Sequence, residues 1–282
     1  MKTTLLVLLS TLFVVESYAK GNEERINLNV ATFNLRMDTP NDGENSWSHR
    51  KEMVKGLIQF HDFDIFGTQE GFIHQIKDIL EVKEYDYVGV GRDDGKEAGE
   101  HSAIFYKKDR FTVLEKGNYW LSLTPEQPSY GWDAKIKRIC SWAKFKDKVT
   151  GKEFYFFCVH YDHQGEVARR ESSLLMLSRI KTIAGSKPFF CTGDFNATPD
   201  SEPIQIILKD GKLIDSKKIS KLSPYGTEGT FNNYKINAPL RERIDFIFVS
   251  KDVIVNKYGV LNEIQYGRFP SDHFPVMINA EF

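Results

Sequence analysis

The sequence has 282 residues, and its 38 lysines and arginines against 39 aspartates and glutamates give a formal net charge of −1. Proteins that hold long nucleic acids usually carry a basic excess, because much of their affinity comes from phosphate contacts, and this balanced chain shows none. Local clusters such as Lys107-Lys108 and residues 135–138 remain able to line a small phosphate pocket.

The first 19 residues have the parts of a secretory signal peptide. Lys2 supplies the charge, residues 5–15 are apolar, and cleavage is expected after Ala19. Since the apolar run is shorter than the roughly 20 residues that cross a bilayer, we expect no stable membrane anchor. The sequence therefore predicts a periplasmic or secreted protein with a mature chain of residues 20–282.

Cysteine usage points to free thiols. The chain has three cysteines, Cys140, Cys158 and Cys191, which is an odd number for an exported protein. Two of them lie in apolar runs, where a thiol behaves as a small hydrophobic side chain. We expect buried free thiols and no zinc site, because the spacing does not fit one.

The chain begins with an alternating strand over residues 26–35. Asn34 continues the parity of Leu28 and Val30, so an amide faces the core at the strand's end. This asparagine is either a hydrogen-bonded residue that closes the strand or part of a site. The turn-forming residues 36–49 that follow predict a long loop with Trp47 on its rim.

A carboxylate ends the next strand. Helical spacing over residues 53–61 precedes a short strand over 64–70, which ends in Glu70 before a second helix over about 72–80. In isolation, Glu70 also suits the first turn of that helix, where the helix dipole favours an acidic residue.

Residues 85–160 contain successive strand-like runs that suit antiparallel pairing, over 85–90, 102–106, 140–145 and 154–160. The intervening segment 123–137 is irregular. The last of these runs delivers His160 at its tip, so a second apolar strand ends in an ionisable residue.

The most informative stretch follows a helix predicted over residues 166–184. The run 189–192 is apolar and then stops at Gly193-Asp194-Phe195-Asn196, which is typical of a buried strand ending in a polar turn. Asp194 and Asn196 also suit a plain turn, because both residue types bond to their own backbone.

Two further strands begin with chemistry-bearing residues. After a loop over residues 226–240, Asp245 lies at the start of the strand 243–249, and Asp272-His273 enters the strand that ends the chain. No repeat or linker divides the chain, so residues 20–282 are expected to form a single domain.

Six polar strand ends are hard to explain separately. Ionised groups are costly to bring together unless a cation or their mutual pairing compensates. Oxygen ligands without clustered cysteines favour Mg²⁺ or Mn²⁺. Histidines paired with carboxylates suit general acid-base work or stabilisation of charge on a phosphoryl oxygen.

These motifs resemble, in order and spacing, those of the endonuclease/exonuclease/phosphatase superfamily across residues 26–282. The motifs are Asn34-Leu35-Arg36, Gln69-Glu70, the His160 strand, Gly193-Asp194-Phe195-Asn196, residues 243–247 and Ser271-Asp272-His273. The resemblance implies an α/β, DNase I-like four-layer sandwich, in which two packed, mainly antiparallel sheets are flanked by helices and carry the site at one end.

The resemblance also implies roles for the site residues. Glu70 would be the principal ligand of Mg²⁺ or Mn²⁺, with Asn34 and Asp272 close to the ion or its waters. Asp194 would orient or deprotonate the attacking water, and Asn196 would hold this water or a phosphate oxygen. His273, oriented by Asp245, would contact the scissile phosphate. His160 would bind another of its oxygens.

The substrate stays open at this stage. Within the superfamily the chain looks most like a secreted or periplasmic bacterial branch, and this resemblance does not fix a substrate. We expect a monomeric phosphoesterase that acts on a small, sugar-linked or lipid-linked phosphate mono- or diester. An exported nuclease with the same machinery and a non-catalytic binding module are the alternatives. Four residues either shape the pocket or are structural: Trp47, Asp162, His163 and Arg169.

Overall fold

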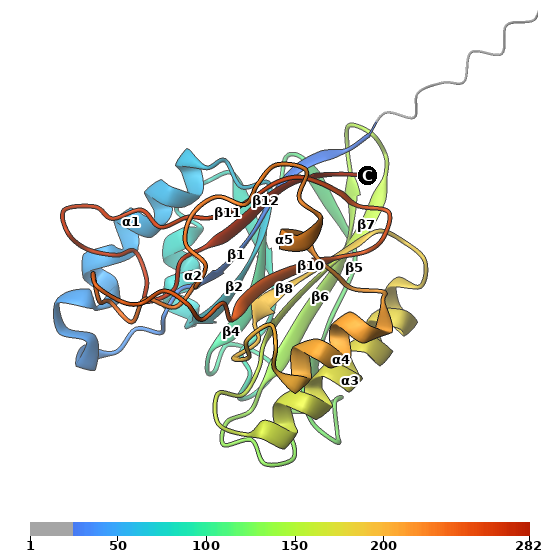
Figure 1. The fold of residues 1–282 in the computed structure, drawn as a ribbon, viewed down its shortest axis with the longest axis horizontal. Coiled ribbons are helices and arrows are strands. Elements are labelled where there is room, and N and C mark those ends of the chain that lie inside the picture. The colour runs from blue at the N-terminus through green and yellow to red at the C-terminus, as the bar shows by residue number, and fades with distance from the viewer. Residues whose placement is uncertain (1–24) are drawn as a thin grey trace, which may run out of the picture.

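The computed structural model describes residues 25–282 as two six-stranded sheets packed face to face with helices on both outer sides (Figure 1). The predicted signal peptide lies outside the described residues. In spatial order the first sheet contains β11 (Ile254–Val260), β12 (Val276–Glu281), β1 (Asn27–Asn34), β2 (Ile65–Gly71), β4 (His101–Lys107) and β3 (Tyr85–Val88).

The second sheet repeats this plan. Its strands in spatial order are β5 (Phe111–Trp120), β6 (Ile139–Asp147), β7 (Glu153–His160), β8 (Phe189–Asp194), β10 (Asp245–Val249) and β9 (Ile214–Asp215). Each sheet has one parallel pair at its centre, β1 with β2 and β7 with β8, and its other pairs are antiparallel. The predicted pair of mainly antiparallel sheets is confirmed.

Alternation along the strands builds the layers. Leu28 and Val30 of β1 enter the core between the sheets, whereas Ala31 and Phe33 enter the core beneath the helices of the first sheet. The inner core is rich in aromatic rings, including the stacked pair Phe145 and Phe154. Because successive side chains of a strand point to opposite faces, one strand serves both layers.

Helices form the two outer layers (Figure 1). α1 (Trp47–Phe60) and α2 (Ile73–Ile79) bury their apolar sides on the first sheet, and α3 (Glu166–Ala184) and α4 (Glu202–Asp210) cover the second. Two short helices, η1 (Pro40–Asn45) and α5 (Ser216–Ile219), lie in connections. No helix within residues 25–282 is long and apolar enough to cross a membrane.

Some expectations need correction. The segment 36–49 is not all loop, since it contains η1 and the start of α1. Trp47 is buried, and its indole Nε1 donates to Asp78 at 2.7 Å, so it does not lie on the rim of this segment. The strands β5, β9 and β11 and the helix α4 went unpredicted, while the three cysteines are buried and free as expected.

Candidate active site

The predicted site residues meet at one edge of the sandwich. β1, β2, β7 and β8 end there, because each parallel pair directs both carboxyl ends the same way. β10 runs antiparallel to β8, so its first residue, Asp245, pairs with Asp194, and β7 places His160 on the other side of Asp194. Asp272 and His273 precede β12, the antiparallel neighbour of β1.

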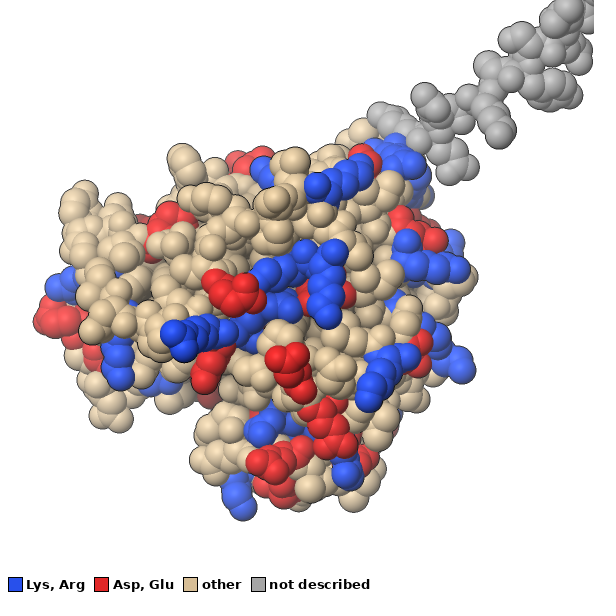
Figure 2. Space-filling view, viewed as in Figure 1, with Lys and Arg blue, Asp and Glu red and all other residues tan. Residues whose placement is uncertain are grey.

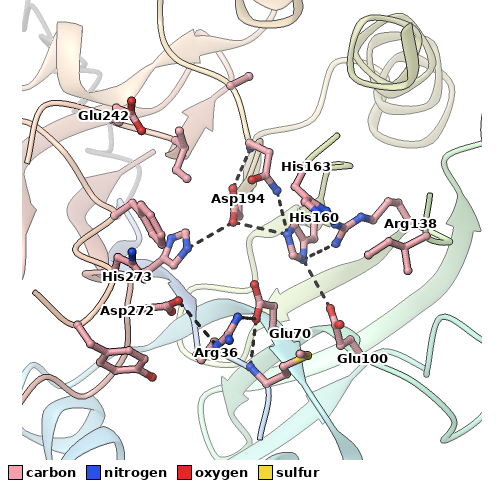
Figure 3. Close-up of a pocket in the computed structure, with 18 of the residues that line it drawn as sticks. Arg36, Glu70, Glu100, Arg138, His160, His163, Asp194, Glu242, Asp272 and His273 are labelled. Carbon is pink, nitrogen blue, oxygen red and sulfur yellow. Dashed lines mark hydrogen bonds and ion pairs between the residues drawn. The ribbon is translucent and has the colours of Figure 1, made fainter. Parts of the chain in front are cut away.

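A cavity of about 610 Å³ opens at this edge (Figure 3). Six of the eight predicted site residues line it, namely Glu70, His160, Asp194, Asn196, Asp272 and His273. The other two, Asn34 and Asp245, are fully buried directly behind the lining.

Asn34 links two carboxylates. Its amide Nδ2 donates to Glu70 Oε1 and to Asp194 Oδ2, both at 3.0 Å, and its Oδ1 accepts from the backbone N–H of Arg36 at 2.9 Å. The core-facing amide predicted at the end of the first strand therefore fixes the spacing of Glu70 and Asp194.

Three residues of the site have left-handed backbone conformations. The φ angles are +56° at Arg36, +65° at Glu70 and +46° at Asn196. Such angles cost about 1–3 kcal/mol outside glycine and persist where the surrounding structure enforces them, often at functional sites. Here they follow the ends of β1 and β8 and bend the end of β2, where its register with β4 shifts between Thr68 and Gly71.

Glu70 is held as an anion. Burial alone would raise the pKa of Glu70, but the positive charge of His273 and the hydrogen bond from Asn34 lower this pKa below its ordinary value. The backbone N–H of Met37 donates to Oε2 at 3.1 Å. An ionised carboxylate at the pocket surface is the kind of ligand that a hard divalent cation prefers.

Asp194 has the opposite tendency. Burial and the neighbouring carboxylate of Asp245 raise the pKa of Asp194 to about 7. The backbone N–H of Asn196 donates to Oδ1 at 2.8 Å, which fixes the orientation of the carboxylate. A carboxylate with a pKa near neutrality suits an acceptor of a proton from water.

His273 and Asp245 form a buried ion pair. Nδ1 of His273 lies 2.8 Å from Asp245 Oδ2, and its Nε2 lies 3.8 Å from Asp194 Oδ2. Burial opposes protonation, but the charge of Asp245 and its hydrogen bond outweigh burial and raise the pKa of His273 well above its ordinary value. A cationic imidazolium therefore faces the pocket.

His160 has a different partner. Nη1 of Arg138 donates to its Nδ1 at 3.0 Å, and burial together with the charges of Arg138 and Arg92 lowers the pKa of His160 well below its ordinary value. A neutral imidazole that accepts at Nδ1 carries its proton on Nε2. That nitrogen lies 3.5 Å from Asp194 Oδ2 on the pocket side.

Arg138 and Glu100 also line the pocket, and neither was predicted from the sequence as a site residue. Arg138 is buried and also donates through Nη2 to Nδ1 of His163 at 3.0 Å. Glu100 pairs with Arg92 at 2.5 Å and lies 3.9 Å from His160. The basic cluster 135–138 marked the region but not which residue faces the pocket.

A divalent cation fits the donors at the closed end of the pocket. Carboxylate oxygens of Glu70 and Asp194 lie within 4.8 Å of each other. Asp272 lies on the far side of the Arg36 guanidinium, which is 3.9 Å from both Glu70 and Asp272. Glu70 and Asp272 thus share the positive charge of Arg36. Of the two, Glu70 is the carboxylate better placed to bind a divalent metal ion.

The remaining candidates are placed as follows. Asp162 accepts hydrogen bonds from the backbone of Gln164 and Gly165 and so shapes the turn before α3. Arg169 donates to the carbonyl of Asp162 at 3.0 Å, and neither residue lines the cavity. His163 does line it, beside Arg138.

Two facing sheets with carboxylates and histidines gathered at one end are the arrangement of a DNase I-like fold. Residues 31–273 match the sequence model of the Endonuclease/Exonuclease/phosphatase family, and the chain belongs to this family. The family assignment predicted from the motifs is confirmed.

Two solved structures from Bacteroides thetaiotaomicron are similar over nearly their whole length. One, an endonuclease/exonuclease/phosphatase family protein, is 46% identical with a TM-score of 0.89, covering 92% of this chain and 99% of the other. The second, a mannosyl-6-phosphatase, is 46% identical with a TM-score of 0.87, covering 90% and 100%. The human Nocturnin catalytic domain, 18% identical with a TM-score of 0.72, covers 91% and 96% and shares the fold.

Proposed function

We propose that the protein is an exported, metal-dependent phosphoesterase that hydrolyses a small phosphate ester by direct attack of water. The observation that carries this proposal is the placement of Asp194 between two histidines in opposite protonation states, His160 and His273, at the closed end of one pocket. That arrangement supplies a proton acceptor and two donors to a phosphate at once.

The chain's own residues divide the work. Asp194, oriented by the Asn196 backbone, accepts a proton from the attacking water. The imidazolium of His273 offsets charge on a phosphate oxygen, and the Nε2 proton of His160 binds another. No serine or cysteine is among the cavity-lining residues, which agrees with attack by water rather than by the protein.

Glu70 would hold Mg²⁺ or Mn²⁺, with Asn34 fixing its carboxylate and Asp272 close by. A bound divalent cation polarises a phosphoryl oxygen and contributes several kcal/mol to transition-state stabilisation.

A small substrate is favoured over long nucleic acid. The cavity volume is within the range of about 300–1,000 Å³ usual for small-molecule sites. A short strip of Lys and Arg in the middle of the face in Figure 2 has Asp and Glu beside it, so this face offers no extended basic track. The similar mannosyl-6-phosphatase supports a sugar phosphate as the ester.

Export rests on the signal-peptide pattern of residues 1–19. An exported enzyme of this kind would meet phosphorylated sugars or lipids outside the cytoplasm. N-terminal sequencing of protein recovered from outside the cytoplasm would test cleavage after Ala19.

The test is release of phosphate or of the alcohol from a panel of monoesters, diesters and oligonucleotides, with and without a chelator, in 50 and 200 mM salt. We expect activity on small esters that disappears with chelator and in Glu70→Ala, and that changes little with salt. A nuclease that neutralises 6–10 phosphates would instead lose about 10³–10⁵ in affinity over this salt range. Full activity in chelator, or strongly salt-sensitive cleavage of oligonucleotides as the best substrate, would contradict the proposal.

A further inference from the structure

One wall of the pocket is formed by the loop over residues 226–244. Phe231, Asn233 and Glu242 from this loop line the cavity (Figure 3 labels Glu242). The loop is tied down, because the N–H of Thr230 donates to the carbonyl of Glu242 at 2.9 Å and the N–H of Asn232 donates to that of Asp272 at 2.7 Å.

The polar side chains of this wall have no partner, unlike those of the catalytic cluster. The side chains of Asn233 and Glu242 are exposed and form no hydrogen bond or ion pair within residues 25–282. Asn233 and Tyr234 have φ angles of +50° and +55°, a conformation that costs energy for residues other than glycine. Because the side chains of Asn233 and Glu242 line the cavity without a partner among the described residues, they are free to hydrogen-bond a ligand.

Apolar surface lies beside these groups. The centroid of the Phe231 ring lies 5.0 Å from that of His273, the residue proposed to contact the scissile phosphate. A carboxylate accepts hydrogen bonds from hydroxyl groups, and an amide can both accept from them and donate to them. An aromatic ring packs against the C–H face of a sugar.

The charges of the lining exclude a second phosphate. No lysine is among the lining residues, and the two arginines are engaged, Arg36 by Asp42 and Arg138 by His160 and His163. A nucleotide tail or a second phosphate would meet the Glu242 carboxylate without a free cation to offset the repulsion.

We propose that Phe231, Asn233 and Glu242 form a subsite for the neutral, hydroxylated leaving group of a sugar monophosphate and so determine specificity. This inference rests on the proposed phosphoesterase function. A site that hydrogen-bonds substrate hydroxyls discriminates strongly against analogues that lack them, because its polar groups are then left unpaired.

The experiment compares kcat/KM for hexose 6-phosphates that differ at one hydroxyl, for a hexose bisphosphate and for methyl phosphate. We expect wild-type enzyme to prefer one hexose 6-phosphate over methyl phosphate by about 100-fold or more. Glu242→Ala and Asn233→Ala should each lower kcat/KM for that hexose phosphate by about 10- to 100-fold, mainly through KM. Their kcat/KM for methyl phosphate should stay within about 2-fold of wild type, which also shows that they fold.

Glu228→Ala is the matched control, since it removes a carboxylate from the same loop that pairs with Lys217 away from the pocket. This variant should have the wild-type kcat/KM for both the hexose phosphate and methyl phosphate. Hydrolysis of no monoester or diester at all would refute the phosphoesterase function itself, whereas hydrolysis of diesters alone would overturn the subsite. Hydrolysis of methyl phosphate without preference for any hexose phosphate, equal losses on both substrates in Glu242→Ala, or preference for the bisphosphate would overturn the subsite alone.

Discussion

Two histidines of the site are held in opposite protonation states by their nearest neighbours. Asp245 keeps His273 cationic, whereas burial, together with the charge of Arg138, which donates to Nδ1, keeps His160 neutral. The site can therefore offset phosphate charge with one ring and donate a hydrogen bond with the other, without either ring taking the proton of the attacking water. That proton is left to Asp194.

This division predicts the cost of single substitutions. Asp194→Asn keeps the shape but cannot accept the proton, and His273→Gln removes the cation, so each should lower kcat by at least about 100-fold. Steady-state kinetics with thermal unfolding would measure both effects. His61→Gln, which changes a histidine paired with Glu263 outside the cavity, should keep wild-type kcat. Near-native turnover of either site variant would show that its role is assigned wrongly.

At the scale of the elements, strand ends carry the chemistry and also the strain. Glu70 bends the end of β2 and Asn196 follows β8, and both hold left-handed φ angles. Asn196 gains a hydrogen bond in return, since its amide Nδ2 donates to the carbonyl of Tyr161 at 3.0 Å.

The strain at Asn196 is measurable by comparing two truncations. Asn196→Gly and Asn196→Ala both remove the amide, but only alanine must keep a Cβ at φ +46°. The alanine variant should be less stable than the glycine variant by about 1 kcal/mol, which is roughly 2–4 °C in Tm for a domain of this size. Both should lose activity similarly. Equal melting temperatures would mean that the turn relaxes without cost.

Much of this element pattern was predictable from local sequence. Buried strands appear in the sequence as apolar runs, so these runs predicted the strands β1, β2, β7 and β8. The polar residues at which the runs stop, Asn34, Glu70, His160 and Asp194, were predicted as site residues. β5 went unpredicted because it lies at a sheet edge and is only partly buried, so it lacks an apolar run. The role of Arg138 went unpredicted for another reason, since only the pairing of β6 with β7 brings this residue next to His160.

At the scale of the whole molecule, the two sheets approach each other closely behind the site. Gly67 of β2 faces Thr192 and Cys158 of the second sheet, and a Cβ added there would lie 2.8 Å from Cys158 Sγ and closer still to Thr192 Oγ1. Gln69 donates to Cys158 Sγ at 3.3 Å in the same region. The position of Glu70 relative to His160 and Asp194 therefore depends on how tightly the sheets pack.

This contact predicts a coupled loss of stability and activity in Gly67→Ala. The added methyl group would force the sheets apart, and overpacking of this kind costs about 1–3 kcal/mol. Because Glu70 belongs to one sheet and Asp194 to the other, kcat/KM should fall as well.

Gly56→Ala is the matched control, since a Cβ at this exposed position in α1 meets no atom within 4 Å. It should raise the free energy of unfolding by up to about 1 kcal/mol and leave kcat/KM unchanged. Urea unfolding with kinetics on the best phosphate ester measures both quantities, and a Gly67→Ala enzyme as stable and active as wild type would show that the sheets tolerate a wider spacing.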